Sequence, residues 1–227
     1  MNNDNVSETI AVFIDGDNIS YKDIPYIIKE INKYDNIIIN NIYSDWREEQ
    51  YINLKQTSIE YGINTIQVDK INGKNSTDIK LMIDIMKSLY ENNHITLYYI
   101  VTSDCDYKHI IPNIQMQNRK VNIIGTEQTN ISLKNICNLF INIESLKPPV
   151  NTNLILLEIN NIMKNNIKLN LGNLNTKIKD KYNYFNYKKY GCESISEFIN
   201  NYYSMHYIVI NNNIYNTSIL LSLDNNM

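Results

Sequence analysis

The chain of 227 residues has little of what marks disulfide-rich, zinc-binding or membrane proteins. Its three cysteines, Cys105, Cys137 and Cys192, lie far apart without metal-ligand or redox spacing, which favours a reducing compartment. The three histidines show no zinc pattern either. No run of eighteen apolar residues occurs, which argues against a transmembrane helix. The polar start, residues 1–8, resembles neither a signal peptide nor a transit peptide, so we expect a cytoplasmic protein.

Glycine and proline are also scarce, at six and four residues, whereas asparagine, isoleucine, lysine and tyrosine are abundant. We interpret this bias as the codon usage of an AT-rich genome. Hydrophobic and charged contents of 43% and 20% are typical of a globular protein with one large or two modest domains. Residues 1–150 hold 14 basic and 19 acidic side chains, whereas residues 151–227 hold 7 and 5. The acidic excess therefore lies in the first 150 residues.

The first 146 residues alternate between short apolar segments and amphipathic ones. Apolar runs stopped by turn-forming residues predict strands, and apolar residues at a spacing of three and four predict helices. Strands that are hydrophobic throughout imply a parallel sheet covered on both faces. We therefore predict an α/β, Rossmann-like three-layer domain with a parallel central sheet over residues 1–146. Its predicted strands are 9–14, 37–43, 64–68, 96–102 and 121–125, and its predicted helices are 23–34, 48–61, 76–90 (capped by Ser76 or Thr77), 107–118 and 131–140.

A second, smaller domain is predicted after Lys147-Pro148-Pro149-Val150. Two prolines followed by asparagines predict a stiff linker over residues 147–152. Three helices and a terminal hairpin predict a winged helix-turn-helix domain over residues 153–227. The helices are expected at 153–164, 171–181 and 194–203, and the strands at 207–210 and 214–217 around Asn211–Asn213.

Aspartates follow or begin several of these predicted elements. The carboxyl ends of parallel strands form the ligand-binding edge of an open sheet, so acids at two strand ends are expected to converge. Mg²⁺ prefers oxygen ligands, and converging carboxylates repel one another without a cation. A divalent metal site is therefore predicted from three groups of acids: Asp15 and Asp17 after the first strand, Asp78 at a helix start, and Asp104 and Asp106 after the fourth strand.

A structural interpretation of each acid stands beside this one. A single aspartate at a strand end or a helix start is most often a turn former or a cap. Asp84 lies six positions after Asp78 and is equally expected to pair with Lys80 or Lys87 on a solvated helix face. Because two such groups of acids follow strands of the same predicted sheet, a metal site explains the acids together better than separate capping roles do.

Three segments together resemble an NYN domain, a branch of the PIN-like ribonuclease superfamily in the LabA-like group. They are AVFIDGDN (11–18), GKNSTDIKLMIDIM (73–86) and VTSDCDYKHIIPNI (101–114), and the resemblance spans about residues 9–145. Ser103 stands where the family has a glycine, and Pro112 is shifted because His109-Ile110 replaces the proline-containing stretch. The residues that match the family pattern are Asp15, Asn18, Asp78, Asp84, Ser103, Asp104, Asp106 and Tyr107.

The resemblance implies a Rossmann-like PIN fold and hydrolytic cleavage of RNA. It implies Mg²⁺ or Mn²⁺ held by the catalytic acids, with Asn18 and either Ser103 or Thr102 orienting water, metal or a phosphate oxygen. Self-association as a homodimer is a further expectation. The catalytic and metal-binding acids that it implies are Asp15, Asp78, Asp104 and Asp106.

The segment YKKYGCESISEF (187–198) resembles the LOTUS domain, also called OST-HTH. That module is associated with binding RNA or docking RNA helicases. Lys188 and Lys189 lie in a stretch where lysines alternate with tyrosines, a pattern that suits phosphate contact and base stacking. A lysine-rich solvated surface is an equally good interpretation. Ser194 to Glu197 also fits a capping box, and Gly191 is expected at a positive φ.

Two further functions stay open at this point. The first is a non-catalytic RNA-binding or adaptor protein on a PIN-like scaffold, for which the aspartates would be replaceable. The second is a phosphatase or phosphotransferase with Asp15 as nucleophile, because Asp15-Gly16-Asp17 resembles the D-x-D of haloacid-dehalogenase-like phosphatases. The Ser103-Asp104-Cys105-Asp106 segment favours the nuclease over this last alternative.

Overall fold

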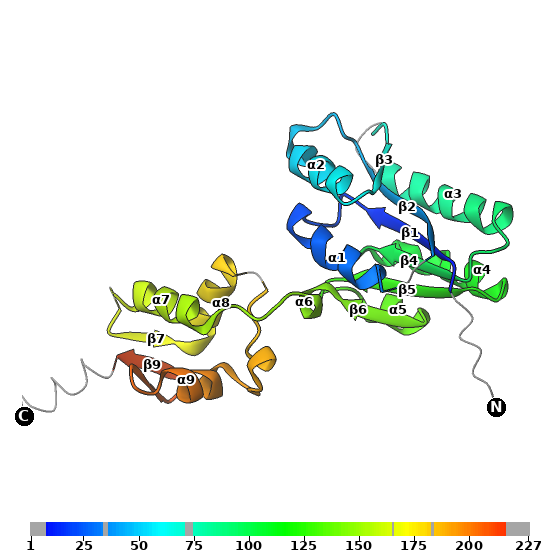
Figure 1. Cartoon of the computed structure of the whole chain (residues 1–227). Helices are drawn as coiled ribbons and strands as arrows, with labels where there is room; N and C mark the ends of the chain where they lie inside the picture. The colour runs from blue at the N-terminus through cyan, green and yellow to red at the C-terminus, as the bar shows by residue number, and fades with distance from the viewer. Residues whose placement is uncertain (1–7, 34–35, 71–74, 165, 183, 217–227) are drawn as a thin grey trace, which may run out of the picture. The chain divides into compact units, whose positions relative to one another are not determined.

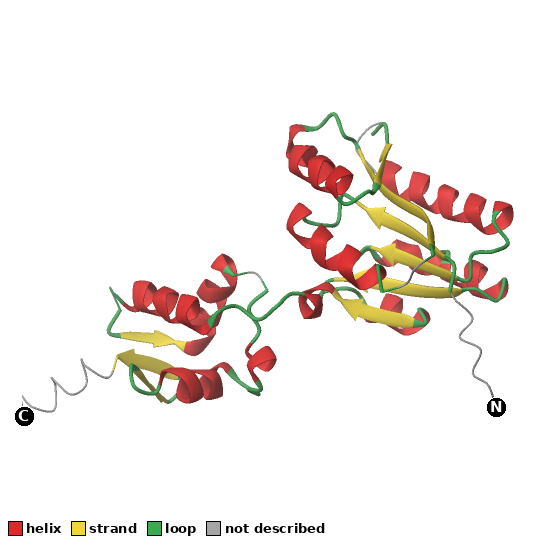
Figure 2. Ribbon diagram, in the orientation of Figure 1, coloured by secondary structure: helices red, strands yellow, loops and turns green. Residues whose placement is uncertain are grey.

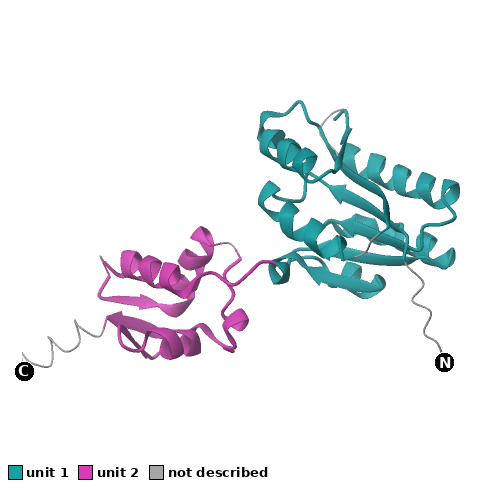
Figure 3. Ribbon diagram, in the orientation of Figure 1, with its two compact units in different colours: residues 1–146 teal, residues 147–227 magenta. Residues whose placement is uncertain are grey.

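The chain folds into two compact units, residues 1–146 and residues 147–227 (Figure 3). A computed structural model describes residues 8–33, 36–70, 75–164, 166–182 and 184–216. In these described ranges, no helix combines the length and the apolar character that crossing a membrane requires.

Unit 1 is built on a six-stranded parallel sheet with the order β3-β2-β1-β4-β5-β6 (Figure 1). Every residue of β1 and β4 is buried, which explains why these strands are hydrophobic throughout. The strand order reverses between β1 and β4, so their carboxyl ends form the switch point at which open sheets bind ligands. The strands are β1 (Ile10–Asp15), β2 (Ile37–Ser44), β3 (Asn64–Gln67), β4 (Leu97–Val101), β5 (Lys120–Gly125) and β6 (Leu139–Asn142).

Helices cover both faces of this sheet, which confirms the predicted three-layer α/β domain (Figure 2). One face packs against α1 (Ile24–Ile31), α2 (Ile52–Glu60) and α6 (Ile143–Leu146). The other face packs against α3 (Ser76–Glu91), α4 (Ile111–Met116) and α5 (Ile131–Ile136). Alternate residues of β1 point to the two faces, so the same strand supplies both cores.

Two of the predicted helices are wrong in extent. The segment predicted as one helix over 131–140 ends at Ile136, because Cys137 is extended and the backbone amide of Asn138 bonds to the carbonyl of Val121. Its last residues form the edge strand β6 instead. The helix predicted over 107–118 is split into a 3-10 helix, η3 (Cys105–His109), and α4, whose second residue is Pro112. Proline is tolerated there because the first turn needs no amide donor.

The start of α3 also differs from the prediction. Asn75 occupies the cap position in a left-handed conformation, with φ of 51°, and its side chain makes no capping hydrogen bond. Ser76 and Thr77 are already helical. Residues 71–74, between the predicted strand at 64–68 and this helix, lie outside the described part of the chain.

Unit 2 combines helices with a small antiparallel sheet of order β7-β9-β8. The predicted hairpin of β8 and β9 is confirmed, and Asn211 and Asn212 form its turn at positive φ. The strand β7 was not predicted, because three residues are too few for a periodic signal. The elements are α7 (Thr152–Met163), β7 (Lys168–Asn170), α8 (Leu171–Lys181), η4 (Tyr187–Tyr190), α9 (Ile195–Tyr203), β8 (Tyr207–Ile210) and β9 (Asn213–Asn216).

The segment that we predicted as a linker, residues 147–152, contributes to the packing of unit 2. Val150 belongs to its hydrophobic core, and the carbonyl of Val150 accepts a hydrogen bond from the Tyr190 hydroxyl. Asn151 caps α7 by accepting a hydrogen bond from the amide of Asn153. The two prolines therefore precede a segment with tertiary contacts rather than a free spacer.

Gly16 offers a test of how closely the chain after β1 approaches β2. A Cβ added to Gly16 would lie 2.6 Å from the backbone oxygen of Tyr43, which already accepts the Gly16 amide at 2.9 Å. We expect Gly16→Ala to lower the free energy of unfolding by about 1–3 kcal/mol, since backbone must move to relieve the clash. Urea unfolding followed by Trp46, the single tryptophan, measures this change. An unchanged midpoint would contradict the close approach.

Candidate active site

Asp15 is the last residue of β1 and is completely buried. Its Oδ2 accepts hydrogen bonds from Asn18 Nδ2 at 2.6 Å, Thr102 Oγ1 at 3.1 Å and Tyr107 Oη at 3.4 Å. Burial raises the pKa of Asp15 from 3.8 to about 7, and the nearby negative charges of Asp78 and Asp17 act in the same direction. The hydrogen bonds from Asn18 and Thr102 oppose the rise without cancelling it.

Asp78 reaches the same place from the first turn of α3. Its Oδ1 accepts a hydrogen bond from Tyr107 Oη at 3.0 Å, so one hydroxyl lies between Asp78 and Asp15. Burial raises the pKa of Asp78, and the charges of Asp104 and Asp17 add to this effect. Burial and these two carboxylates raise the pKa of Tyr107 far above its ordinary value, so the hydroxyl keeps its proton and remains a donor.

Asp104 follows β4 and caps η3 by accepting a hydrogen bond from the amide of Asp106 at 2.9 Å. The amide of Asp104 donates to Thr102 Oγ1 at 3.1 Å, and that hydroxyl in turn donates to Asp15. Asp104 is half-buried, and its charge acts on Asp78. The structure therefore brings Asp15, Asp78 and Asp104 together at the carboxyl ends of β1 and β4.

Asp106 lies at the margin of this group. Its side chain is exposed, and its backbone amide is what ties it to Asp104. Its assignment as a metal ligand stays a prediction.

The Asp17 side chain connects four parts of the fold. Its Oδ1 accepts a hydrogen bond from Ser44 Oγ at 2.7 Å, and its Oδ2 accepts one from Thr77 Oγ1 at 2.8 Å. Lys70 Nζ lies 3.2 Å from Oδ2 and also pairs with Glu48. Burial alone would raise the pKa of Asp17, but these donors outweigh it and the pKa is lowered. Asp17 is therefore an ionised structural acid that holds α3 and β2 in place.

The residues predicted to bind substrate have specific structural contacts. Asn18 donates to Asp15, which orients that carboxylate. Ser103 Oγ lies 3.1 Å from Thr126 Oγ1 and accepts the Thr126 amide at 2.9 Å, so it links the ends of β4 and β5. In unit 2, Lys188 is exposed, whereas Lys189 Nζ donates to the carbonyl of Lys147 at 2.7 Å.

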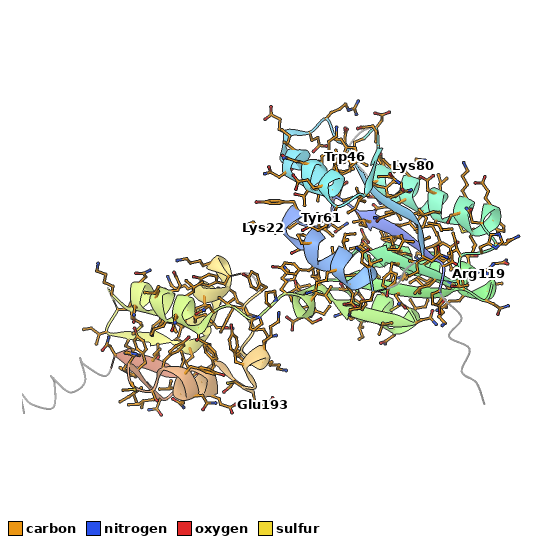
Figure 4. All side chains as sticks on the ribbon, viewed as in Figure 1. Lys22, Trp46, Tyr61, Lys80, Arg119 and Glu193 are labelled. Carbon is orange, nitrogen blue, oxygen red and sulfur yellow. The ribbon has the colours of Figure 1, made fainter. Side chains whose placement is uncertain are left out.

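Asp84, which matches the family pattern, lies away from this group of acids. It pairs with Lys80 at 2.7 Å one turn earlier on α3, which confirms the structural interpretation. Both line a groove of about 360 Å³ between α3 and strands β2 and β3. Figure 4 labels Lys80 on α3.

Oxygen donors dominate the site, which suits a hard divalent cation. The raised pKa values of Asp15 and Asp78 reflect burial and mutual repulsion that a cation would relieve. Among the described residues, no three or more acidic, histidine or cysteine side chains converge closely enough to hold a metal by themselves. Mg²⁺ usually keeps several waters and takes one or two protein carboxylates plus a substrate phosphate, so it does not require three converging protein ligands.

Sequence reasoning missed most of the side chains that hold the acids. The roles of Thr102 and Tyr107 as donors to Asp15, and of Ser44 and Thr77 as donors to Asp17, were not predicted. Their sequence signals are the resemblance to the family, which includes Tyr107 and Thr102, and the polarity of Ser44, Thr77 and Thr102 at a strand end or in a helix first turn. These signals do not say which acid each of them contacts, because the partners lie 27 to 92 positions away.

An α/β sheet with acids at the β1/β4 switch point agrees with the PIN-like fold that the resemblance implies. The NYN domain family matches residues 9–144, and the chain belongs to this family, a branch of the PIN-like nuclease superfamily.

A comparison with solved structures finds a similar fold. A crystal structure of a protein of unknown function from Vibrio parahaemolyticus RIMD 2210633 matches with a TM-score of 0.50 and 16% sequence identity. The match covers 63% of this chain and 96% of that one. At this identity the similarity concerns the fold alone. No curated protein matches the chain.

The raised pKa of Asp15 has a consequence for stability. The native state binds more protons than the unfolded chain between about pH 4 and about pH 7, so stability falls as the pH rises through this window. With divalent metal removed, we expect Asp15→Asn to raise the free energy of unfolding at about pH 8 by about 2 kcal/mol or more. The limit is about 4 kcal/mol, because each pKa unit corresponds to about 1.36 kcal/mol.

Urea unfolding in a chelator, followed by Trp46, measures this difference at about pH 4 and about pH 8. At the lower pH we expect Asp15→Asn to bring little gain. Glu127→Gln serves as a control, because it removes an exposed carboxylate of the same unit. Equal gains for both variants at pH 8, or a gain that does not depend on pH, would show that burial of Asp15 is not the cause.

Proposed function

We propose that the protein is a divalent-metal-dependent ribonuclease that hydrolyses RNA phosphodiester bonds. The observation that carries the proposal is the convergence of Asp15, Asp78 and Asp104, from three separate elements, at the β1/β4 switch point of an NYN domain. Bringing carboxylates together inside a protein costs free energy unless a cation or a substrate group offsets their repulsion. A structural role alone does not account for this arrangement.

Asp15, Asp78 and Asp104 would hold Mg²⁺ or Mn²⁺, with Asp106 as a further candidate at the exposed margin. When bound, the metal would lower the pKa of a coordinated water and neutralise charge that develops on the phosphate. Asn18, Thr102 and Tyr107 would keep the carboxylates oriented, since all three donate hydrogen bonds to them. Water and the RNA phosphate would complete the set of ligands.

Asp104→Asn tests this proposal directly. We expect the substitution to lower metal-dependent cleavage of end-labelled single-stranded and structured RNAs by about 100-fold or more, the usual effect of losing one electrostatic contact to the reacting group. Asp84→Asn is the matched control, because Asp84 lies on α3 in an ion pair with Lys80. Reactions run in Mg²⁺, in Mn²⁺ and in a chelator.

Cleavage that survives Asp104→Asn, or that persists in the chelator, would contradict the proposal. RNA binding without cleavage by either protein would favour the adaptor, a non-catalytic RNA-binding protein on the same scaffold. Turnover of a chromogenic phosphomonoester would favour the phosphatase. The Ser103-Asp104-Cys105-Asp106 segment disfavours the phosphatase.

We further propose that unit 2 is a winged-helix module of the LOTUS class that binds RNA or docks a helicase. In this unit β7 pairs with β9, the second strand of the hairpin β8–β9. The predicted Ser194–Glu197 capping box is present and has a structural role at the start of α9: Ser194 Oγ accepts the amide of Glu197, whose carboxylate accepts the amide of Glu193. Gly191 has a φ of 76°, as its position in the motif predicts.

Lys188 is the exposed lysine of the predicted pair, whereas Lys189 contacts the backbone of Lys147. We therefore expect Lys188→Glu in the full chain to weaken RNA binding several-fold. We also expect the slope of log affinity against log salt concentration to become shallower by about one, the loss of one phosphate contact. Fluorescence anisotropy with labelled RNA at two salt concentrations measures both. Lys168→Glu, an exposed lysine of β7, is the charge-matched control, and an equal loss for both variants would indicate a non-specific effect.

A further inference from the structure

The Tyr107 side chain joins three elements of unit 1 at a single hydroxyl. It belongs to η3, the 3-10 helix that follows β4, and its ring is completely buried in the core beneath α3 and α4. The hydroxyl lies 3.0 Å from Asp78 Oδ1, on α3, and 3.4 Å from Asp15 Oδ2, at the end of β1. A tyrosine hydroxyl has one proton to donate, so both carboxylates compete for the same donor.

The hydrogen bonds around Asp15 are distributed unequally between its two oxygens. Oδ2 faces three side-chain donors, from Asn18, Thr102 and Tyr107. Oδ1 accepts the backbone amide of Asp17 at 3.2 Å. Oδ2 is thus held by the protein, whereas Oδ1 retains more of its capacity for another ligand.

We propose that Tyr107 is a positioning residue that holds Asp15 and Asp78 by one oxygen each and turns their other oxygens towards a divalent cation. The inference rests on the proposed function, because it assigns Tyr107 a role towards that same metal. Hydrogen bonds from a second layer of residues orient carboxylate ligands, and their loss typically weakens metal binding 10- to 100-fold.

Tyr107→Phe removes the hydroxyl and keeps the buried ring. We expect its affinity for Mn²⁺, measured by isothermal titration calorimetry on the full chain, to fall about tenfold. We also expect RNA cleavage by the variant to be weak at low Mn²⁺ and to recover as Mn²⁺ is raised, with KM for RNA unchanged. A residue with a purely structural role would not give a loss that metal rescues.

Tyr98→Phe is the matched control. Tyr98 is completely buried in the same core, but its hydroxyl contacts Ser88 on α3 at 3.5 Å instead of the acids. We expect it to bind Mn²⁺ as the wild type does. Circular dichroism checks that each variant is folded. Should Tyr107→Phe unfold, Thr102→Val removes another donor to Asp15 Oδ2 and is expected to weaken Mn²⁺ binding in the same direction.

The outcomes separate this inference from the proposed function. Wild-type affinity in Tyr107→Phe, or an equal loss in Tyr98→Phe, would overturn the role of Tyr107 and leave the metal-dependent nuclease intact. A wild-type protein that binds no Mn²⁺ would overturn both. A selective loss in Tyr107→Phe that high Mn²⁺ rescues would establish the positioning role.

Discussion

The Asp15 carboxylate is buried, so the rest of the site must supply hydrogen-bond donors to it. The group lies at the end of a strand whose residues are all inaccessible, where an ionised carboxylate is costly without compensation. Compensation comes from donors on the turn after β1, on the end of β4 and on the 3-10 helix that follows it. The donors from Thr102 and Tyr107 are in place only if β1 and β4 are adjacent and in register. The sheet order and the site therefore depend on each other.

The acids could be predicted from the sequence because each lies at a recognisable boundary. Asp15 and Asp104 follow apolar runs that become the two central strands, and Asp78 lies in the first turn of a strongly amphipathic helix. Parallel strands place such boundaries on one edge, so their convergence follows from strand direction. The same logic did not distinguish Asp17 from the others, although the structure gives it an entirely structural set of partners.

The rest could not be predicted because it depends on contacts between distant parts of the chain. Thr102 and Tyr107 contact Asp15 although they lie 87 and 92 positions after it in the sequence, and their local sequence does not indicate that they bond to Asp15. The error over residues 131–140 has a similar origin, since Leu139-Phe140-Ile141 continues an apolar pattern that suits a helix. Pairing with β5, which is non-local, makes this segment a strand.

The abundance of asparagine has a consequence for how the protein responds to its solvent. Asparagines cap α5, α7, α8 and η4, and the non-glycine residues described at positive φ are Asn75, Asn118, Asn211 and Asn212. Aspartate could fill the same capping positions but would add charge. Because the amide is neutral, these helix starts should be indifferent to acid and to ionic strength. Acid and salt act instead on the carboxylates, which include both the site acids and the structural acid Asp17.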